Sequence, residues 1–539
     1  MRLVAGLAAV LVLGRSAGAP LSFCVLPPTR HLNFSEPCES HAAISAPNVS
    51  WAAMRGEYES VQILLDAPLP AGDLRLTFSD LVAPSGGATI PSAALSWSQQ
   101  GYIFVRHTSR YADSGCPGKN KDGSCWRPDP LLPPRKDGTI ELLGEPGESQ
   151  PLWITVAVPR NAAPAPEGAE YTGTVTMRVT GGGGKHGGGG GDPIFVPISL
   201  EVWPVTVPTT AEATIQNVWG FSAAHVLPFY PHLSAAEVTY KWWDFMTAHR
   251  IPPLEAAFET VNATAAHPSG SAAYLQGKTG VLESGLERKD CNCSSCPPEA
   301  AKANALAMAS KVAAAKATGG KYYAYAFDEA PKSCEKSIRA AFGAFLEAYP
   351  PSSHPEVGGT MSALNWAAAT GGNSGPTGSH PSARGMPMDM PYTAWVLQYQ
   401  YYNQTIADWW VNSTEPVTGR PRELYLYHCI EPSKPEYLNI FIERPLIHAR
   451  LLFWLGASQN IQGWLYWTTD LWQNCPTSPE KYSWQHANRT VMQRINGSKY
   501  TDCAQTATPH HNLLPMKISD RLCVLSRPGV DHLVQPKAL

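Results

Sequence analysis

Two adjacent carboxylic acids, Asp328 and Glu329, are the residues of this chain best suited to chemistry. They follow the apolar run 322–327 and come shortly before Pro331, so they lie where a predicted strand ends. In a β/α barrel the active site lies at the carboxyl ends of the strands. Carboxylates also stabilise the start of a helix, but the next helix is predicted to begin only near residue 333. The position of the pair therefore favours a catalytic role.

The spacing of the two carboxyl groups restricts the reaction. Glycosidases normally place two carboxyl groups on opposite sides of the scissile bond, about 5–9.5 Å apart, which consecutive residues cannot easily do. The pair instead suits a mechanism in which the 2-acetamido oxygen of the substrate attacks the anomeric carbon. Glu329 would protonate the leaving oxygen, while Asp328 would orient the acetamide and stabilise the oxazolinium charge. Repulsion between the neighbours helps to keep one group protonated while the other is ionised.

Two other interpretations stay open. A retaining glycosidase with two separate carboxylates would use Glu329 as acid/base and Glu431, which follows a later predicted strand, as nucleophile. A catalytically silent carbohydrate-binding surface glycoprotein would keep the aromatic side chains without turnover. A serine hydrolase has little support, because the sequence contains no G-x-S-x-G motif.

Aromatic and polar residues near the ends of the predicted strands complete the candidate site. An aromatic ring packs on the C–H face of a sugar, while the sugar hydroxyls need polar partners. The aromatic candidates are Trp219, Tyr325, Trp366, Trp395, Tyr427 and Trp467, and the polar candidates are His428, Glu431 and Asp470. Core packing competes with a binding role, most directly for Tyr325 and Trp395, which fall within strands, and His428 has an equally good structural interpretation. The chemistry requires no metal and no organic cofactor.

The elements that must position these residues alternate between strand and helix from about residue 211 onward. Strands are expected at 215–219, 250–254, 322–327, 356–361, 393–397, 423–427 and 462–467, and helices at 235–249, 298–317, 334–349 and 445–456. An eighth strand would have to lie within 260–290. This alternation predicts a (β/α)8-type barrel rather than an open doubly wound sheet, because no glycine fingerprint follows the first strand.

The N-terminal part has the pattern of a β-sandwich. Short runs of period-two character separated by Pro, Gly and Ser occur at 59–65, 74–78, 152–158, 172–179 and 194–202. The glycine tract 181–191 fits a hairpin tip between two strands better than a phosphate loop, because no helix follows it. The expected organisation is multidomain, with β and α/β parts: a signal peptide at 1–19, a β-sandwich at 20–208, a β/α barrel at 209–475 and a Cys-containing tail at 476–539.

Three features together resemble glycoside hydrolase family 123, which overlaps the set known as domain of unknown function 4091. They are the β-rich N-terminal part, the strand that ends Tyr-Ala-Phe-Asp-Glu at Glu329, and the Trp-rich segment 463–472. The resemblance covers about residues 50–475. It implies an exo-acting β-N-acetylgalactosaminidase with the retaining, acetamide-assisted mechanism. It also implies that Asp328 orients the acetamide and that Glu329 is the acid/base.

The start and the composition of the chain indicate export. A basic residue, an apolar run and small residues fill positions 1–19, as in a secretory signal peptide, and eight N-x-S/T sequons are scattered along the 539 residues. The chain has 41 Lys plus Arg and 44 Asp plus Glu, and its net charge of -3 gives no overall positive potential that would attract nucleic acid or an anionic membrane. The sequence predicts a secreted protein, or one in the lumen of the secretory or endolysosomal pathway. Its expected partner is a glycan or glycoconjugate, without stable membrane insertion; the oligomeric state is left open.

The 12 cysteines are interpreted as disulfide partners, since an even count in an oxidising compartment favours disulfides over metal sites. Short separations suggest pairing of Cys24 with Cys38 and of Cys116 with Cys125. The cluster 291–296 allows a zinc site as a minor alternative, and it would need a fourth ligand such as Cys334.

Overall fold

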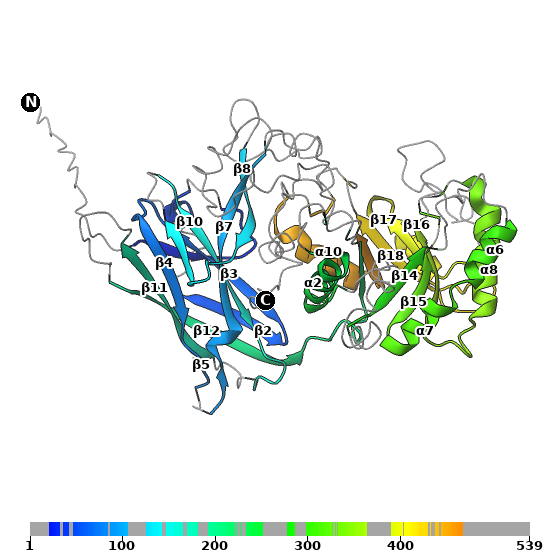
Figure 1. Cartoon of the computed structure of the whole chain (residues 1–539), viewed down its shortest axis with the longest axis horizontal. Coiled ribbons are helices and arrows are strands. Elements are labelled where there is room, and N and C mark those ends of the chain that lie inside the picture. Colours follow the sequence, from blue (N-terminus) through cyan, green and yellow to red (C-terminus); the bar gives the residue numbers. More distant parts are fainter. Residues whose placement is uncertain are drawn as a thin grey trace, which may run out of the picture.

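The fold is seen in a computed structural model, which places a β-rich N-terminal part beside a part in which helices flank a parallel sheet (Figure 1). The structure describes residues 21–32, 36–41, 47–84, 87–105, 125–142, 147–164, 170–181, 192–220, 223, 227, 233–251, 278–285, 298–325, 327–328, 330, 332–363, 390–402, 404–428, 432, 437–440 and 444–466. The chain is thus multidomain and rich in β-structure, as expected.

The N-terminal part consists of two sheets packed face to face. The first has the order β1 (Phe23–Leu26), β3 (Tyr58–Leu65), β10 (Gln150–Ala157), β7 (Leu95–Val105) and β8 (Cys125–Leu132). The second has the order β2 (Val49–Arg55), β12 (Ile194–Thr206), β11 (Tyr171–Gly181), β4 (Gly72–Phe78) and β9 (Thr139–Leu142), with β5 (Leu81–Val82) and β6 (Thr89–Ile90) beside it. All pairings are antiparallel except that of β2 with β12. β11 and β12 flank the glycine tract and pair with each other.

Alternating burial explains why the two sheets stack. In β2 the side chains of Val49, Trp51 and Ala53 are buried, while the residues between them are exposed. β3 and β10 contribute the buried Ile63 and Ile154 to the same core. One hydrophobic core therefore lies between the two inner faces, as in other β-sandwiches.

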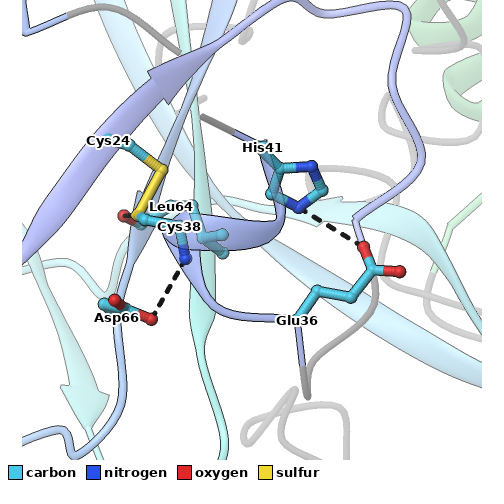
Figure 2. Close-up of a disulfide and its surroundings, with 6 residues drawn as sticks. All are labelled: Cys24, Glu36, Cys38, His41, Leu64 and Asp66. Atoms are coloured by element: carbon cyan, nitrogen blue, oxygen red, sulfur yellow. Dashed lines mark hydrogen bonds and ion pairs between the residues drawn. A yellow bond between two sulfur atoms is a disulfide. The ribbon is translucent and has the colours of Figure 1, made fainter. Parts of the chain in front are cut away.

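A disulfide joins the first described strand of this sandwich to the short helix that follows it (Figure 2). Cys24 on β1 is bonded to Cys38 in the short helix η1 (Cys38–His41), which confirms the predicted pair. The backbone N–H of Cys38 donates to Asp66 Oδ1 at 3.3 Å. His41, at the end of η1, lies 3.4 Å from Glu36, and its burial lowers the pKa of the imidazole although Glu36 acts in the opposite direction.

The second part is built on a parallel sheet of seven described strands. Their order is β13 (Gln216–Trp219), β19 (Gly463–Tyr466), β18 (Glu423–His428), β17 (Ala394–Gln398), β16 (Val357–Ala363), β15 (Lys321–Tyr325) and β14 (Val281–Gly285). The two outermost strands, β13 and β14, contact each other, so the sheet is curled. At this contact the Gln216 side chain packs directly against Gly280, just before β14.

Helices cover the outer face of the curled sheet. They are α2 (Ala235–Ala248), α6 (Pro298–Leu306), α7 (Ala309–Thr318), α8 (Glu335–Ala348), α9 (Gln404–Val411) and α10 (Ile447–Ser458). α2 begins with a capping box in which the Ser234 side chain accepts from the Glu237 N–H and the Glu237 carboxylate accepts from the Ser234 N–H. Within the described residues no helix is long and apolar enough to cross a membrane.

The sequence placed most of these elements correctly but not all. The eighth strand, which was expected within 260–290, is β14. The single helix expected at 298–317 is interrupted between α6 and α7, and α9 was not anticipated. The strand expected at 250–254 does not begin there: Arg250 lies in a turn with a φ of 58°, and 252–254 lie outside the described residues. Seven strands are therefore described, and closure into an eight-stranded barrel is not confirmed.

The inner side of the curled sheet is filled near its amino-terminal end by two tyrosines. Tyr323 and Tyr425 meet edge to face with ring centroids 6.1 Å apart, and Tyr323 donates to Glu423 Oε2 at 2.6 Å. Glycines make the room, because a Cβ at Gly358 would collide with the Tyr323 ring and one at Gly463 with the Tyr425 ring. The tyrosine rings fill the interior at the amino-terminal end of the sheet, so a substrate site is expected at the carboxyl end.

Several polar contacts join the sandwich to the helical part. Arg450 on α10 pairs with Glu59 on β3 at 3.1 Å, and His31 Nε2 donates to the Arg444 carbonyl at 2.9 Å. Arg250, after α2, donates through Nε to the Pro208 carbonyl at 3.0 Å and through Nη2 to the Gly56 carbonyl. These contacts hold the sandwich against α2 and α10.

Removing the disulfide should destabilise the sandwich. The double variant Cys24→Ser/Cys38→Ser opens a loop with a sequence separation of 14, and we expect its free energy of unfolding to fall by about 2–3 kcal/mol, because the unfolded chain regains loop entropy. Urea unfolding followed by tryptophan fluorescence measures the change. An unaltered midpoint would show that this bond does not contribute to stability.

The packed end of the sheet can be tested with a pair of glycine variants. Gly463→Ala should cost about 1–3 kcal/mol or more, since the added methyl meets both the Tyr425 ring and the Gln216 carbonyl. Gly343→Ala is the matched control, because no described atom lies within 4 Å of a Cβ placed there on α8, and it should stabilise by about 0.5–1 kcal/mol. Thermal unfolding compares the two, and equal effects would contradict the packing described.

Candidate active site

Asp328 lies directly beyond the carboxyl end of β15 and is exposed. Its carboxylate Oδ1 accepts a hydrogen bond of 2.5 Å from the hydroxyl of Tyr325, the last residue of the strand. The distance is at the short end for O–H···O bonds, as expected when the acceptor is charged. The bond therefore fixes the orientation of the Asp328 carboxylate.

The backbone that carries Asp328 adopts an uncommon conformation. Phe327 has a φ of 59°, in the left-handed region that bulky residues avoid, at a cost of about 1–2 kcal/mol. Its ring is buried in the core against Phe342 of α8, with ring centroids 6.2 Å apart. The N–H of Ala330, which is also buried, donates to the Phe327 carbonyl at 3.2 Å. Core packing on both sides thus holds the turn in which Asp328 lies.

A buried tyrosine lies within reach of the charge on Asp328. Burial raises the pKa of Tyr392 well above its ordinary value, and the negative charge of Asp328 is a further, smaller cause. The Tyr392 ring stacks on Phe342, with the ring planes only 8° apart. Phe342 therefore contacts both Phe327, which precedes Asp328, and Tyr392, whose pKa the charge of Asp328 helps to raise.

Strand register decides which candidate residues share a face with Tyr325. Paired residues of neighbouring parallel strands point to the same side, and successive residues alternate. Tyr325 pairs with Met361, which pairs with Ala394, and these residues belong to the inner side of the sheet. Tyr427 lies on the same side, next to Gln398 in the register. Tyr325, Tyr427 and Gln398 thus share the inner side near the carboxyl ends of their strands, and Asp328 is joined to this side by its bond from Tyr325. Tyr427 and Gln398 are largely buried, and Gln398 was not anticipated.

Three of the expected binding residues lie on the opposite, helix-covered face. Trp395 is buried between the sheet and α9, with its ring 5.3 Å from that of Trp410. Trp219 is buried against α2 and 4.9 Å from Tyr466, whose ring also contacts His428 at 5.1 Å. The structure therefore places Trp219, Trp395 and His428 in the core, away from the inner side on which Tyr325 lies.

The remaining candidates are not placed by the structure. Glu329, Trp366, Glu431, Trp467 and Asp470 lie outside the described residues, so their roles stay predictions. The cluster 291–296 also lies outside them. Cys334 is disulfide-bonded and is thus not available as a zinc ligand. Within the described ranges no group of three or more His, Cys, Asp or Glu side chains could hold a metal ion.

Comparison with known proteins identifies the family that the chain resembles. The model of the glycoside hydrolase 123 catalytic domain matches residues 394–488, which include β17, β18 and β19. The solved structure of a family 123 glycoside hydrolase from Clostridium perfringens, described in connection with glycolipid glycan hydrolysis, matches with a TM-score of 0.58 at 12% identity, over 85% of this chain and 79% of that one. The resemblance to glycoside hydrolase family 123 is confirmed. The family match supports a glycoside hydrolase that acts on glycans, although its matched residues do not include Asp328.

The other comparisons add little. An enzyme that catalyses macrocyclization in alchivemycin A biosynthesis matches with a TM-score of 0.16 at 13% identity, over 35% of this chain and 92% of that one. The CssB subunit of an enterotoxigenic Escherichia coli colonization factor matches with a TM-score of 0.16 at 10% identity, over 29% and 93%. Scores this low support no argument. No curated protein sequence matches the chain.

The two faces of the sheet predict opposite effects for two aromatic variants. Tyr325→Phe should lower kcat on a glycoside substrate about tenfold, because Asp328 loses its hydroxyl donor, while the melting temperature stays close to that of the parent. Trp395→Phe should cost about 1–2 kcal/mol of stability and leave kcat of the folded enzyme unchanged. Steady-state kinetics and thermal unfolding of both variants test the assignment, which fails if Trp395→Phe is the catalytically impaired one.

Proposed function

We propose that this glycoside hydrolase removes terminal β-linked N-acetylhexosamine, specifically N-acetylgalactosamine, with retention and with the help of the substrate's own acetamide. The observation that carries the proposal is the 2.5 Å hydrogen bond from Tyr325 to Asp328 at the carboxyl end of β15. It supports an oriented carboxylate at the edge of a parallel sheet where active sites lie. The family resemblance supports the same reaction class.

In the proposed first step, the acetamide oxygen attacks the anomeric carbon and the bond to the leaving oxygen breaks. Glu329 gives its proton to that oxygen, so the aglycone departs as an alcohol. Asp328 accepts a hydrogen bond from the acetamide N–H and stabilises the positive charge that develops on the oxazolinium ring. The Tyr325 hydroxyl donates to Asp328 Oδ1 and so holds the carboxylate in place while the charge develops.

In the second step, water opens the oxazolinium ring. Glu329, now ionised, takes a proton from the water as its oxygen attacks the anomeric carbon, and the acetamide is restored. The two inversions give overall retention. The chain, the substrate and one water molecule supply every atom of the two steps, so the reaction balances without an oxidant or reductant.

The inner face near Asp328 supports recognition of a sugar. Tyr427 offers an aromatic ring, and the Gln398 amide offers both a donor and acceptor for hydroxyl groups. Gln398 already accepts from Gln400 Nε2 at 2.6 Å, which fixes the orientation of its side chain. Both side chains are largely buried, so their proposed role is to line the floor of the site.

We also propose that the protein works in an oxidising compartment, either secreted or in the lumen of the secretory or endolysosomal pathway. The Cys24–Cys38 disulfide supports this location, because such bonds persist mainly outside the cytosol. The proposed partner is accordingly a glycan or glycoconjugate met in that compartment.

The reaction is tested with aryl β-N-acetylgalactosaminide, β-N-acetylglucosaminide and β-galactoside. We expect turnover of the acetamido sugars only, with the galacto form preferred, and a loss of about 10²–10³-fold in kcat for Asp328→Asn and for Glu329→Gln. Glu431→Gln is the discriminating control and should reduce activity only mildly.

Different outcomes point to the competing interpretations. Cleavage of the plain galactoside together with loss of activity in Glu431→Gln would replace the proposal with the two-carboxylate mechanism of Glu329 and Glu431. Glycan binding without turnover, in a sample with a cooperative unfolding transition, would favour the catalytically silent glycoprotein.

A further inference from the structure

The Phe327 carbonyl has a second donor besides the Ala330 N–H. Ser362, the penultimate residue of β16, donates through Oγ to this carbonyl at 3.2 Å. Its side chain is completely buried. The contact links β16 to the turn that follows β15, and it is made by a side chain to a main-chain atom next to Asp328.

The Phe327 carbonyl is part of the peptide unit that leads into Asp328. A rotation of this unit changes the direction in which Asp328 leaves the turn, and Phe327 already has the unfavourable φ of 59°. Relaxation to the ordinary region would turn the carbonyl away from Ser362. The hydroxyl of Ser362 therefore opposes the motion that backbone strain favours.

We propose that Ser362 is a positioning residue, which fixes the direction of the Asp328 carboxylate by holding the Phe327 carbonyl. The inference rests on the proposed function, because it assigns Asp328 the task of orienting the acetamide. Ser362 does not need to touch the substrate. Its effect is exerted through one peptide unit, in which a displacement of about 1 Å is enough to slow a reaction strongly.

The neighbouring Thr360 provides a matched control on the same strand. Thr360 is also completely buried, and its Oγ1 donates to a main-chain carbonyl, that of Pro391, at 3.1 Å. That carbonyl belongs to the segment before β17 and not to the Asp328 turn. Ser362→Ala removes a buried hydroxyl-to-carbonyl bond next to Asp328. Thr360→Val removes a buried hydroxyl-to-carbonyl bond away from the Asp328 turn, together with the bond that Thr360 Oγ1 accepts from the Thr393 N–H at 3.2 Å, so it is the more disruptive of the two for the fold.

The experiment measures kcat and KM for Ser362→Ala and Thr360→Val, each in the parent and in the Asp328→Asn background. A dinitrophenyl acetamido glycoside keeps slow variants measurable, because its leaving group needs little protonation. We expect Ser362→Ala to lower kcat about tenfold with KM changed less than twofold, and Thr360→Val to leave kcat unchanged. In the Asp328→Asn background, Ser362→Ala should have no further effect, since the carboxylate it positions is gone.

The outcomes separate this inference from the function on which it rests. Asp328→Asn with parental activity overturns the proposed function. A slow Asp328→Asn combined with a normal Ser362→Ala overturns the positioning role alone. An equal loss from Ser362→Ala in both backgrounds, or an equal loss in kcat from Thr360→Val, does the same, because it indicates a general effect on the fold. Thermal unfolding of all five variants, Asp328→Asn included, confirms that folded protein is compared.

Discussion

Each strand of the parallel sheet must bury both of its faces, and this constraint decides which side chains can reach a substrate. Outward residues such as Trp395 and Trp464 pack under the helices, while inward residues such as Tyr323 and Tyr425 fill the curled interior. Because the filling is dense at the amino-terminal end, where glycines leave room for the tyrosine rings, reactive groups can gather only at the carboxyl end. Asp328 and Tyr325 lie there for this reason.

The strained turn at Phe327 depends on the same packing. A left-handed phenylalanine is unfavourable by itself, but its ring contributes to the aromatic cluster with Phe342 and Tyr392. Burying the ring offsets the backbone cost, since about 1.5–3 kcal/mol is gained when such a side chain is removed from water. The hydrophobic core thus supports an exposed carboxylate through the residue that precedes it.

Much of this arrangement could be predicted from the sequence, and the rest could not for physical reasons. Period and composition located five strands of the sandwich, namely β3, β4, β10, β11 and β12, most strands of the parallel sheet, and the acidic pair after β15, because breaks in apolar runs are local signals. The sequence could not show which face of the sheet each aromatic side chain occupies. A strand buried on both sides is apolar at every position, so the sequence pattern does not distinguish Trp219 from Tyr325. The positive φ of Phe327 and the contact from Ser362 come from residues packed in three dimensions. Gln398 could have been suspected as a polar residue at the end of an apolar strand.

Apart from the ion pair between Arg450 and Glu59, the polar contacts described between the sandwich and the helical part use main-chain acceptors, which every residue type possesses. His31 donates to the main-chain carbonyl of Arg444, and Arg250 donates to that of Pro208. Substitution at an acceptor position leaves the carbonyl in place, whereas substitution of His31 or Arg250 removes the donor. Evolutionary drift is therefore constrained unequally across these contacts. The residues whose carbonyls accept these bonds can therefore be substituted without loss of the contact, provided that the donor side chains are retained.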